Sequence, residues 1–181
     1  MSISELVSES YATKWGRPSR RARFDVLGKT IEVYKWNEDV TGEGVAIYAT
    51  NGASAAPPVD PPGRRVEFFV GFSPDFDGIA SSLSLLGSYP LAGATVSVGD
   101  TVTLGDPLWV GGAVSTFLIV PQIEELFDPL LLPDSSHVHF CQVLPISETE
   151  LELKKQRGAQ WLLGELNDQG IPIWTRDRRY L

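Results

Sequence analysis

The 181-residue sequence contains one cysteine, one methionine and two histidines. The single cysteine, Cys141, excludes a disulfide within the chain, and because a cysteine in an apolar strand is usually part of the core, we assign it no chemistry. Apolar runs such as Phe117–Val120 are far shorter than the roughly 20 residues that cross a bilayer. Glu5 stands where a secretory signal would place basic residues, so we expect a cytosolic protein without a membrane segment.

The sequence also lacks the motifs that mark common enzymes. No Gly-x-Ser-x-Gly turn is present, and the nearest segment, Gly71-Phe-Ser-Pro, has proline where that turn must enter a helix. The glycine-rich segments 42–45 and 111–113 lack the Gly-Lys pair of a phosphate-binding loop. Paired loop acids could act in acid-base catalysis only if they were buried together; these pairs are Glu124 with Glu125, Asp75 with Asp77, and Asp100 with Asp106. We therefore predict no enzymatic activity and no cofactor.

The two histidines offer the one metal hypothesis. On a strand, His137 and His139 face the same side, with Cys141 in phase with them. A closed metal site needs further ligands, and the nearest acids, Asp134 and Glu148, lie beyond the strand ends. A neutral, hydrogen-bonded histidine pair is the favoured interpretation, so we expect no bound metal. The alternative is a hydrolase that uses the histidine strand and nearby acids, which would place a perturbed histidine in a cleft.

Charge is distributed unevenly along the chain, whose net charge is −8. Residues 36–153 hold sixteen Asp and Glu but only Arg64 and Arg65, for a net charge of −14. The remaining residues at the two ends hold thirteen Lys and Arg against seven acids, a net charge of +6. Such a separation can steer association with a basic partner, or the basic ends can fold back onto the acidic body. Nucleic-acid binding would require a basic body and is not expected.

Periodicity and turn residues predict one domain over residues 1–181 with mixed elements in irregular order. We expect helices over 2–15 and 77–89, a hairpin over 23–36, and strands over 45–49, 64–72 and 114–120. The strand 64–72 reads as central and covered on both faces, with the helix 77–89 packed on it. A hairpin or bent strand pair is expected over 94–104, an exposed proline-rich loop up to Gly63, and a short helical turn over 123–127. This pattern indicates an α+β fold with a mixed, largely antiparallel sheet and helices packed on its faces.

The segment from His137 carries the clearest local signals. A strand over 137–144 should end at Pro145, which cannot donate to a sheet ladder. Ser147 and Glu150 have the spacing of a capping box, and Ile146 and Leu151 that of a hydrophobic staple. Gly158 is expected to kink or split the helix that follows, before the apolar face resumes at Trp161, Leu162 and Leu166.

This segment, with its His-Val-His-Phe strand, its Pro-Ile-Ser-Glu helix start and Gly158, resembles the carboxyl-terminal part of suppressor-of-fused domains of the bacterial branch. The segments 66–73, 99–109 and 115–120 resemble that family's central strand, loop and following strand, so the resemblance covers roughly residues 30–175. It implies an α+β domain that works by binding another protein. Animal members bind a transcription factor, and many bacterial members look like immunity proteins that neutralise a cognate toxin in polymorphic toxin systems.

An acidic body suits a basic toxin domain as the partner, while a regulator or scaffold without a toxin partner is the alternative within the same class. Tryptophan is enriched in interface anchors, and Trp15, Trp109 and Trp174 are the candidates here. We predict a partner-binding surface at Asp100 and Asp106 with Trp109 as its apolar anchor. The partner's identity and the oligomeric state do not follow from the sequence.

Overall fold

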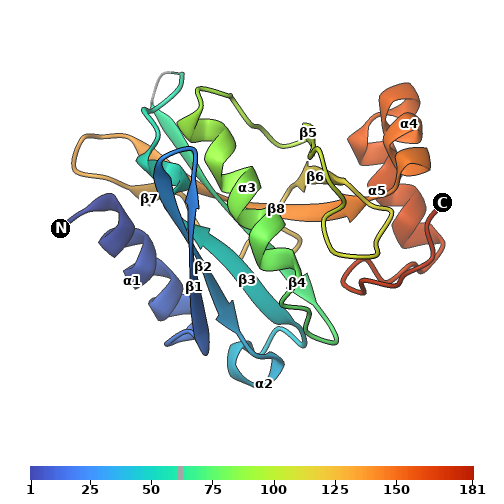
Figure 1. Ribbon diagram of the computed structural model, residues 1–181, viewed down its shortest axis with the longest axis horizontal. Helices are drawn as coiled ribbons and strands as arrows, with labels where there is room; N and C mark the ends of the chain where they lie inside the picture. Colours follow the sequence, from blue (N-terminus) through green and yellow to red (C-terminus); the bar gives the residue numbers. More distant parts are fainter. Residues whose placement is uncertain (61–62) are drawn as a thin grey trace.

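The computed structural model describes residues 1–60 and 63–181, and Figure 1 shows its strands and helices. The strands are β1 (Arg20–Val26), β2 (Lys29–Trp36), β3 (Ala46–Asn51), β4 (Arg64–Phe72), β5 (Thr101–Thr103), β6 (Thr116–Val120), β7 (Leu130–Leu131) and β8 (His137–Ile146). The helices are α1 (Ile3–Trp15), α2 (Glu38–Thr41), α3 (Ile79–Leu91), α4 (Glu148–Arg157) and α5 (Ala159–Asp168), with a 3-10 turn η1 at Ala53–Ala55.

The strands form one eight-stranded sheet in the order β1-β2-β3-β4-β8-β6-β5, and β7 pairs with the start of β8. Every neighbouring pair is antiparallel except β4 and β8, which run parallel. This parallel pair joins the β1–β4 meander to the second antiparallel group, β8, β6 and β5. The predicted α+β class, with a largely antiparallel sheet and helices on its faces, is confirmed.

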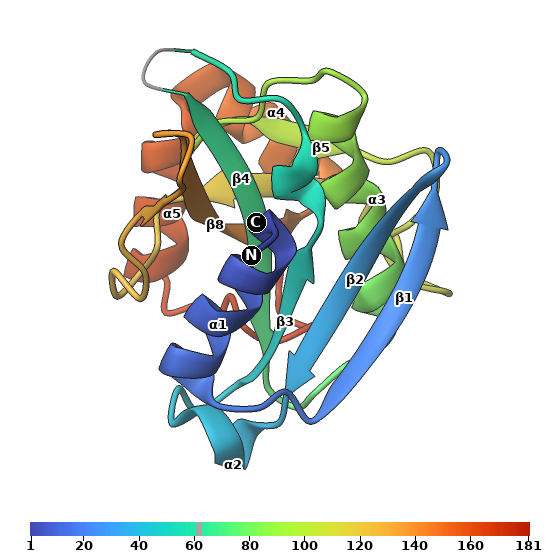
Figure 2. The ribbon, with the colours of Figure 1, turned by 90° about the vertical axis from the view of Figure 1, so that its left-hand side faces the viewer.

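Alternation along β8 divides the core between the two faces of the sheet. Val138 and Phe140 pack in the cluster under α1, and Leu144 and Ile146 pack in the cluster under α5. Val143, with the opposite parity, packs in the cluster under α3. Helices α1 and α5 therefore cover the same face of the sheet and α3 covers the other; Figure 2 shows α1 and α3 on opposite sides of the strands.

The helix boundaries follow the expected local signals. Ser147 and Glu150 form the predicted capping box at the start of α4, and Gly158 separates α4 from α5 with a φ of 91°. An equivalent capping box between Ser2 and Glu5 starts α1 and was not predicted. The helix over 77–89 is confirmed as α3, shifted to Ile79–Leu91.

The prediction that Pro145 ends its strand is wrong, because β8 continues to Ile146. Pro145 lies opposite Phe117 of β6, whereas the pairing of β8 with β4 already stops at Gln142. A residue without an N–H group is tolerated in a strand where a neighbour is missing on one side. The carbonyl of Pro145 accepts a hydrogen bond from Arg178 Nη2 at 3.1 Å.

Two expected conformations also differ. Residues 94–104 do not form their own hairpin, because β5 contains only Thr101–Thr103 and pairs with β6. Residues 123–127 contain a turn but no helix; Gln122 closes it by bonding both the N–H and the carbonyl of Phe127. The pairing of β5 with β6 decides the first case, and the side chain of Gln122 decides the second.

The proline-rich segment after β3 is less exposed than expected, since Ala53 and Ser54 of η1 are buried. The carboxylate of Glu67, fully buried on β4, accepts hydrogen bonds from the N–H groups of Gly52 and Ser54 at 2.9 Å and from the Ser54 hydroxyl at 2.6 Å. Burial of a carboxylate requires such donors, so Glu67 holds the start of this segment against the sheet. Residues 61–62 of the predicted loop lie outside the described residues.

The chain after α5 folds back over the end of the sheet and is held by an ion pair. Arg178 Nη1 and Nη2 each lie 2.7 Å from one carboxylate oxygen of Glu150, and both side chains are almost completely buried. The N–H of Leu181 also donates to Glu150. Residues 171–181, hereafter the C-terminal segment, are therefore fixed to the first turn of α4.

Candidate functional site

A groove of about 370 Å³ opens between the parts of the sheet that α1 and α5 cover. Its floor consists of Ile47 from β3, Phe69 to Gly71 from β4, and Gln142 to Leu144 from β8. Loops on either side complete the wall with Glu43, Val45, Ile123, Glu124 and Leu126, and the C-terminal segment adds Ile173 and Trp174. Most of this lining is apolar, and the volume lies in the range of about 300–1,000 Å³ that is typical of ligand pockets.

The groove exists because β4 and β8 separate within the sheet. Their parallel ladder runs to the Phe69–Gln142 pair and ends there. The next bond, from the N–H of Gly71 to the carbonyl of Val143, is not part of the ladder, and the bond after it would need an N–H at residue 145, which Pro145 lacks. Beyond this point β4 stays with β3 and β8 stays with β6. Pro145 therefore prevents the β4–β8 ladder from resuming beyond this gap.

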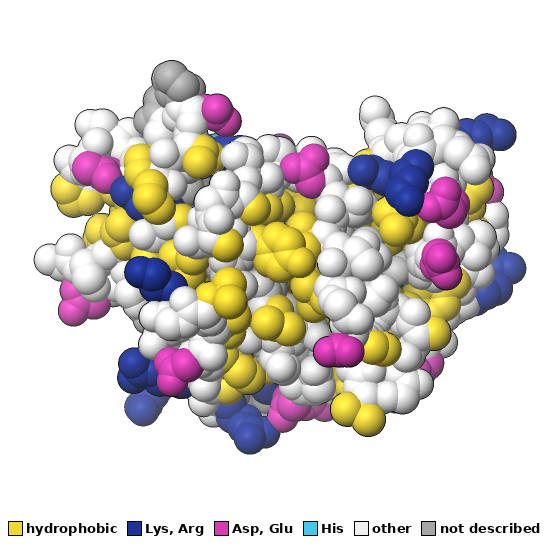
Figure 3. All heavy atoms as spheres, turned by 45° about the horizontal axis from the view of Figure 1, so that its top comes forward, with side chains coloured by type: hydrophobic (Ala, Val, Ile, Leu, Met, Phe, Trp, Pro, Cys, Tyr) yellow, Lys and Arg dark blue, Asp and Glu magenta, His cyan; other side chains and the backbone are white. Residues whose placement is uncertain are grey.

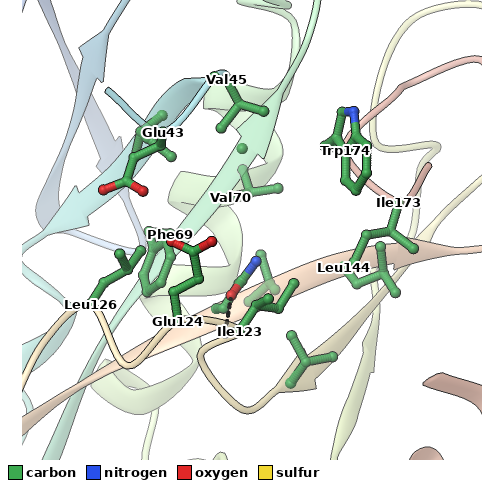
Figure 4. Close-up of a pocket in the computed structure, with 16 residues that line it drawn as sticks. Glu43, Val45, Phe69, Val70, Ile123, Glu124, Leu126, Leu144, Ile173 and Trp174 are labelled. Carbon is green, nitrogen blue, oxygen red and sulfur yellow. Dashed lines mark hydrogen bonds between the residues drawn. The ribbon is translucent and has the colours of Figure 1, made fainter. Parts of the chain in front are cut away.

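Figure 4 shows that one side of the groove is apolar and the other carries an acid. Trp174 and Ile173 lie across the pocket from Glu43 and Leu126. Trp174 is half exposed and Ile123 is 61% exposed, so both present apolar surface to solvent. Gln142 supports the loop with Ile123, because its Oε1 accepts the N–H of that residue at 3.0 Å.

The charge around the groove is negative. Glu43 and Glu124 line it, and no Lys or Arg does. The two flanking segments, residues 37–45 with helix α2 and residues 121–129, hold six acids, Glu38, Asp39, Glu43, Glu124, Glu125 and Asp128. Among the described residues, none of these six forms an ion pair. Glu43 is oriented by Trp15, whose indole Nε1 donates to Glu43 Oε1 at 3.2 Å. The groove is therefore suited to an apolar group next to a positive charge.

The C-terminal segment positions the tryptophan side of the groove. The carbonyl of Trp174 accepts the N–H of Ser73, just after β4, at 2.9 Å. Farther along, Arg178 is locked to Glu150. The backbone of the segment is thus fixed at Trp174 and again at Arg178, although half of the Trp174 side chain remains exposed.

The structure places the predicted surface residues at the two ends of the three-residue strand β5. Asp100 precedes β5, where its carboxylate accepts the N–H of Ser97, and Asp106 and Trp109 lie in the loop beyond the other end of β5. Both acids are exposed. Trp109 is only partly exposed, and its ring packs edge-on against Phe76 with 5.8 Å between centroids. Its contacts include the core, and whether this loop binds a partner stays a prediction.

His139 lines a cavity of about 150 Å³ together with Gln122 and Cys141, and no Asp or Glu of the described residues lines this cavity, so the acids that the hydrolase alternative requires are not found there. His137 Nδ1 is buried without a hydrogen-bond partner among the described atoms, so the expected hydrogen-bonded pair is not present there. Burial lowers the pKa of His139, and the positive charge of Arg64 lowers it further. Burial raises the pKa of the Cys141 thiol to about 11, which disfavours the reactive thiolate. In the described ranges, no group of three or more His, Cys, Asp or Glu residues could hold a metal ion.

Part of the predicted compensation between the basic ends and the acidic body is present. Arg20 pairs with Asp77 at 2.6 Å, and the buried Lys35 pairs with both Asp75 and Asp77. On the face in Figure 3, Lys and Arg lie mainly toward the two ends of the molecule, and the middle carries hydrophobic side chains with scattered Asp and Glu. Compensation at these pairs leaves the loops around the groove acidic. No helix in the described ranges is long and apolar enough to cross a membrane.

An apolar, acid-lined groove of this kind is a feature of a binding module, and comparison with known proteins defines the class. The family model of the suppressor of fused protein (SUFU) matches residues 28–179, so the chain belongs to the SUFU family. SUFU domains bind other proteins. The predicted resemblance over roughly residues 30–175 is therefore confirmed. No curated protein matches the chain in a sequence comparison.

Solved structures share the fold at low sequence identity. A SUFU homolog from Neisseria gonorrhoeae FA 1090 superposes with a TM-score of 0.71 and 18% identity, covering 98% of this chain and 96% of that one. A chain in the crystal structure of the Sufu–Fu complex gives a TM-score of 0.63 at 14% identity, covering 98% of this chain and 89% of that one. Drosophila Suppressor of Fused gives 0.66 at 16% identity, where this chain covers 98% of its own length but 50% of the Drosophila chain.

Proposed function

We propose that this SUFU-family chain is a cytoplasmic immunity protein of a bacterial polymorphic toxin system, which binds and neutralises a basic toxin domain without any enzymatic step. The observation that carries the proposal is the apolar groove whose only charged lining residues are Glu43 and Glu124. An acidic binding surface can occupy the face with which a basic nuclease would bind its nucleic acid.

Physical reasoning supports binding that is steered by charge. The six acids of the flanking segments form no ion pair within the described ranges, so their field extends into solvent. That field is screened over about 8 Å at physiological salt. The buried apolar contact in the groove would then supply most of the affinity, and the surrounding acids would raise the association rate.

The first check is whether the gene immediately upstream encodes a toxin, since its absence would remove the main support for an immunity role. The direct experiment is then to co-express the chain with that toxin domain. We expect the chain to rescue growth, and the purified pair to associate faster at about 0.05 M than at about 0.5 M salt, because salt shortens the reach of the acidic field. Failure to rescue or to bind would leave a SUFU-family regulator of some other protein and would remove the immunity role.

The loop surface predicted from the sequence can be tested with the same pair. If Asp100 and Asp106 contribute to the contact, replacing both with Asn should reduce the salt dependence of the association rate. Replacing Trp109 with Ala tests its role as anchor in the same assay. Equal salt slopes for wild type and the Asp100→Asn, Asp106→Asn variant would remove these acids from the interface.

A further inference from the structure

The opening between β4 and β8 offers backbone groups as well as an apolar pocket. We propose that the groove takes an extended segment of the partner as an added strand on β4, with an apolar side chain against Trp174 and a Lys or Arg beside it facing Glu43 and Glu124. This inference rests on the protein-binding part of the proposed function and specifies how the partner is recognised.

The backbone of β4 is available at Gly71. The N–H of Phe68 points toward β3, because it donates to Thr50 Oγ1 at 2.9 Å. Backbone groups alternate in direction along a strand, so those of Gly71 point toward β8, where the ladder has already ended. The N–H of Ser73, with the same parity, points to that side and is taken by the carbonyl of Trp174. An extended segment entering the groove would pair with Gly71 in the gap before this contact.

The floor at Gly71 is also open because it lacks a side chain. A Cβ atom at this position would lie 2.8 Å from Cγ2 of Val45, so any larger residue would displace the groove wall. With glycine there, a partner backbone can approach β4 closely. The side chain of an inserted residue would then reach the pocket between Trp174 and Leu126, which is lined by apolar groups.

Charge selects the occupant. The groove is lined by two acids and no base, so a segment with Lys or Arg next to its apolar residue is complementary. The edge strand β1 carries the opposite charge, because Arg20, Arg21 and Arg23 lie on this exposed strand. Its arginines are engaged internally: Arg20 pairs with Asp77 and Arg21 lies over the Tyr34 ring. That pattern is typical of an edge protected against pairing, and a basic segment would avoid it.

The test uses the peptide acetyl-Lys-Val-Leu-Val-Lys-amide and its counterpart with Glu in place of both Lys. In amide NMR spectra of the labelled chain, we expect the basic peptide to shift Gly71 and the Trp174 indole, and the acidic peptide to leave both unchanged. Two further basic peptides each carry one backbone N-methyl group, and the methylated residues of the two peptides are adjacent in the sequence. Only alternate amides of an added strand face β4, so one of these peptides should lose binding and the other retain it.

Matched variants assign the charge and apolar contacts. Glu124→Gln should weaken the basic peptide between about twofold and fivefold, as expected for one exposed charge. Glu125→Gln, an equal charge change on a neighbouring exposed residue outside the groove lining, should weaken it less, because that carboxylate acts only through the surrounding field. Trp174→Ala should weaken binding further than Val110→Ala, which removes exposed apolar surface elsewhere.

Several outcomes would overturn the groove as a strand-addition site: shifts confined to Arg20–Val26, equal binding of both charge types, tolerance of both N-methyl groups, or no shift at Gly71. Self-association of the chain that Trp174→Ala abolishes would make a second copy the occupant and would also refute a basic partner segment. If the toxin pair binds and Trp174→Ala and Glu124→Gln leave its affinity unchanged, this inference fails while the immunity role stands. If the peptides bind as expected but no toxin is neutralised, only the immunity role fails.

Discussion

The buried ion pair between Glu150 and Arg178 gives a sharp test of how the C-terminal segment is held. Replacing Glu150 with Gln keeps the size of the side chain and an oxygen that can still accept the N–H of Ser147, so the capping box is retained. The change removes the negative charge that both terminal nitrogens of Arg178 contact at 2.7 Å. Its main effect is therefore on the ion pair.

The expected cost follows from burial. The side chain of Arg178 is 2% exposed and that of Glu150 is fully buried, so the arginine would keep a buried charge without its partner. Breaking such a pair from one side costs about 3–5 kcal/mol. Replacing both partners, as in Glu150→Gln with Arg178→Met, leaves no buried charge and should recover most of this loss.

Urea denaturation of the wild type, the two single variants and the double variant measures these differences. With a slope of about 2 kcal/mol per M, Glu150→Gln should lower the midpoint by about 1.5–2.5 M, and the double variant should lie much nearer the wild type. A loss below about 1 kcal/mol for Glu150→Gln, or a double variant no more stable than the single one, would refute a tightly coupled buried pair.

Three further outcomes are expected. Ser147→Ala should cost about 1 kcal/mol by removing one half of the capping box, and an unchanged urea midpoint would contradict this. Burial raises the pKa of Glu67, so the folded protein holds this proton more tightly than the unfolded chain does. The free energy of unfolding should therefore fall as the pH rises from about 4.5 through the raised pKa. Denaturation at several pH values should show a smaller fall for Glu67→Gln, which has no proton to lose. The thiol of Cys141, with its pKa raised to about 11, should react with a thiol reagent at about pH 8 only after unfolding, and fast labelling of the folded protein would show that it is accessible.

Much of the fold is encoded in local signals. The capping box at Ser147 and the break at Gly158 depend on a few neighbouring residues, so sequence spacing predicts them. Pro145 was predicted wrongly because its effect depends on which strands lie beside it. The pairing of β4 with β8 ends before it, and no local pattern contains that information.

The groove was not predicted for the same reason. Its lining comes from segments as distant as Glu43, Glu124 and Trp174, which only the sheet order brings together. Sequence reasoning noted the acid pair at Glu124 and the tryptophan in the C-terminal segment, but separately. Asp100 and Asp106 are close in sequence and lie at the two ends of the short strand β5, and their role in binding stays a prediction. A candidate surface inferred from spacing alone is weakest where irregular loops build the site.

The parallel pairing of β4 with β8 also has a consequence for how the chain folds. The β1–β4 meander joins neighbours in sequence and can form early, but Arg64 must wait for His137 before the sheet closes at its centre. Contacts between such distant segments slow folding. Until β8 arrives, β4 presents an unpaired edge of large apolar residues, including Phe68 and Phe69, that can pair with other chains. During synthesis, aggregation is therefore most probable between completion of β4 and docking of β8.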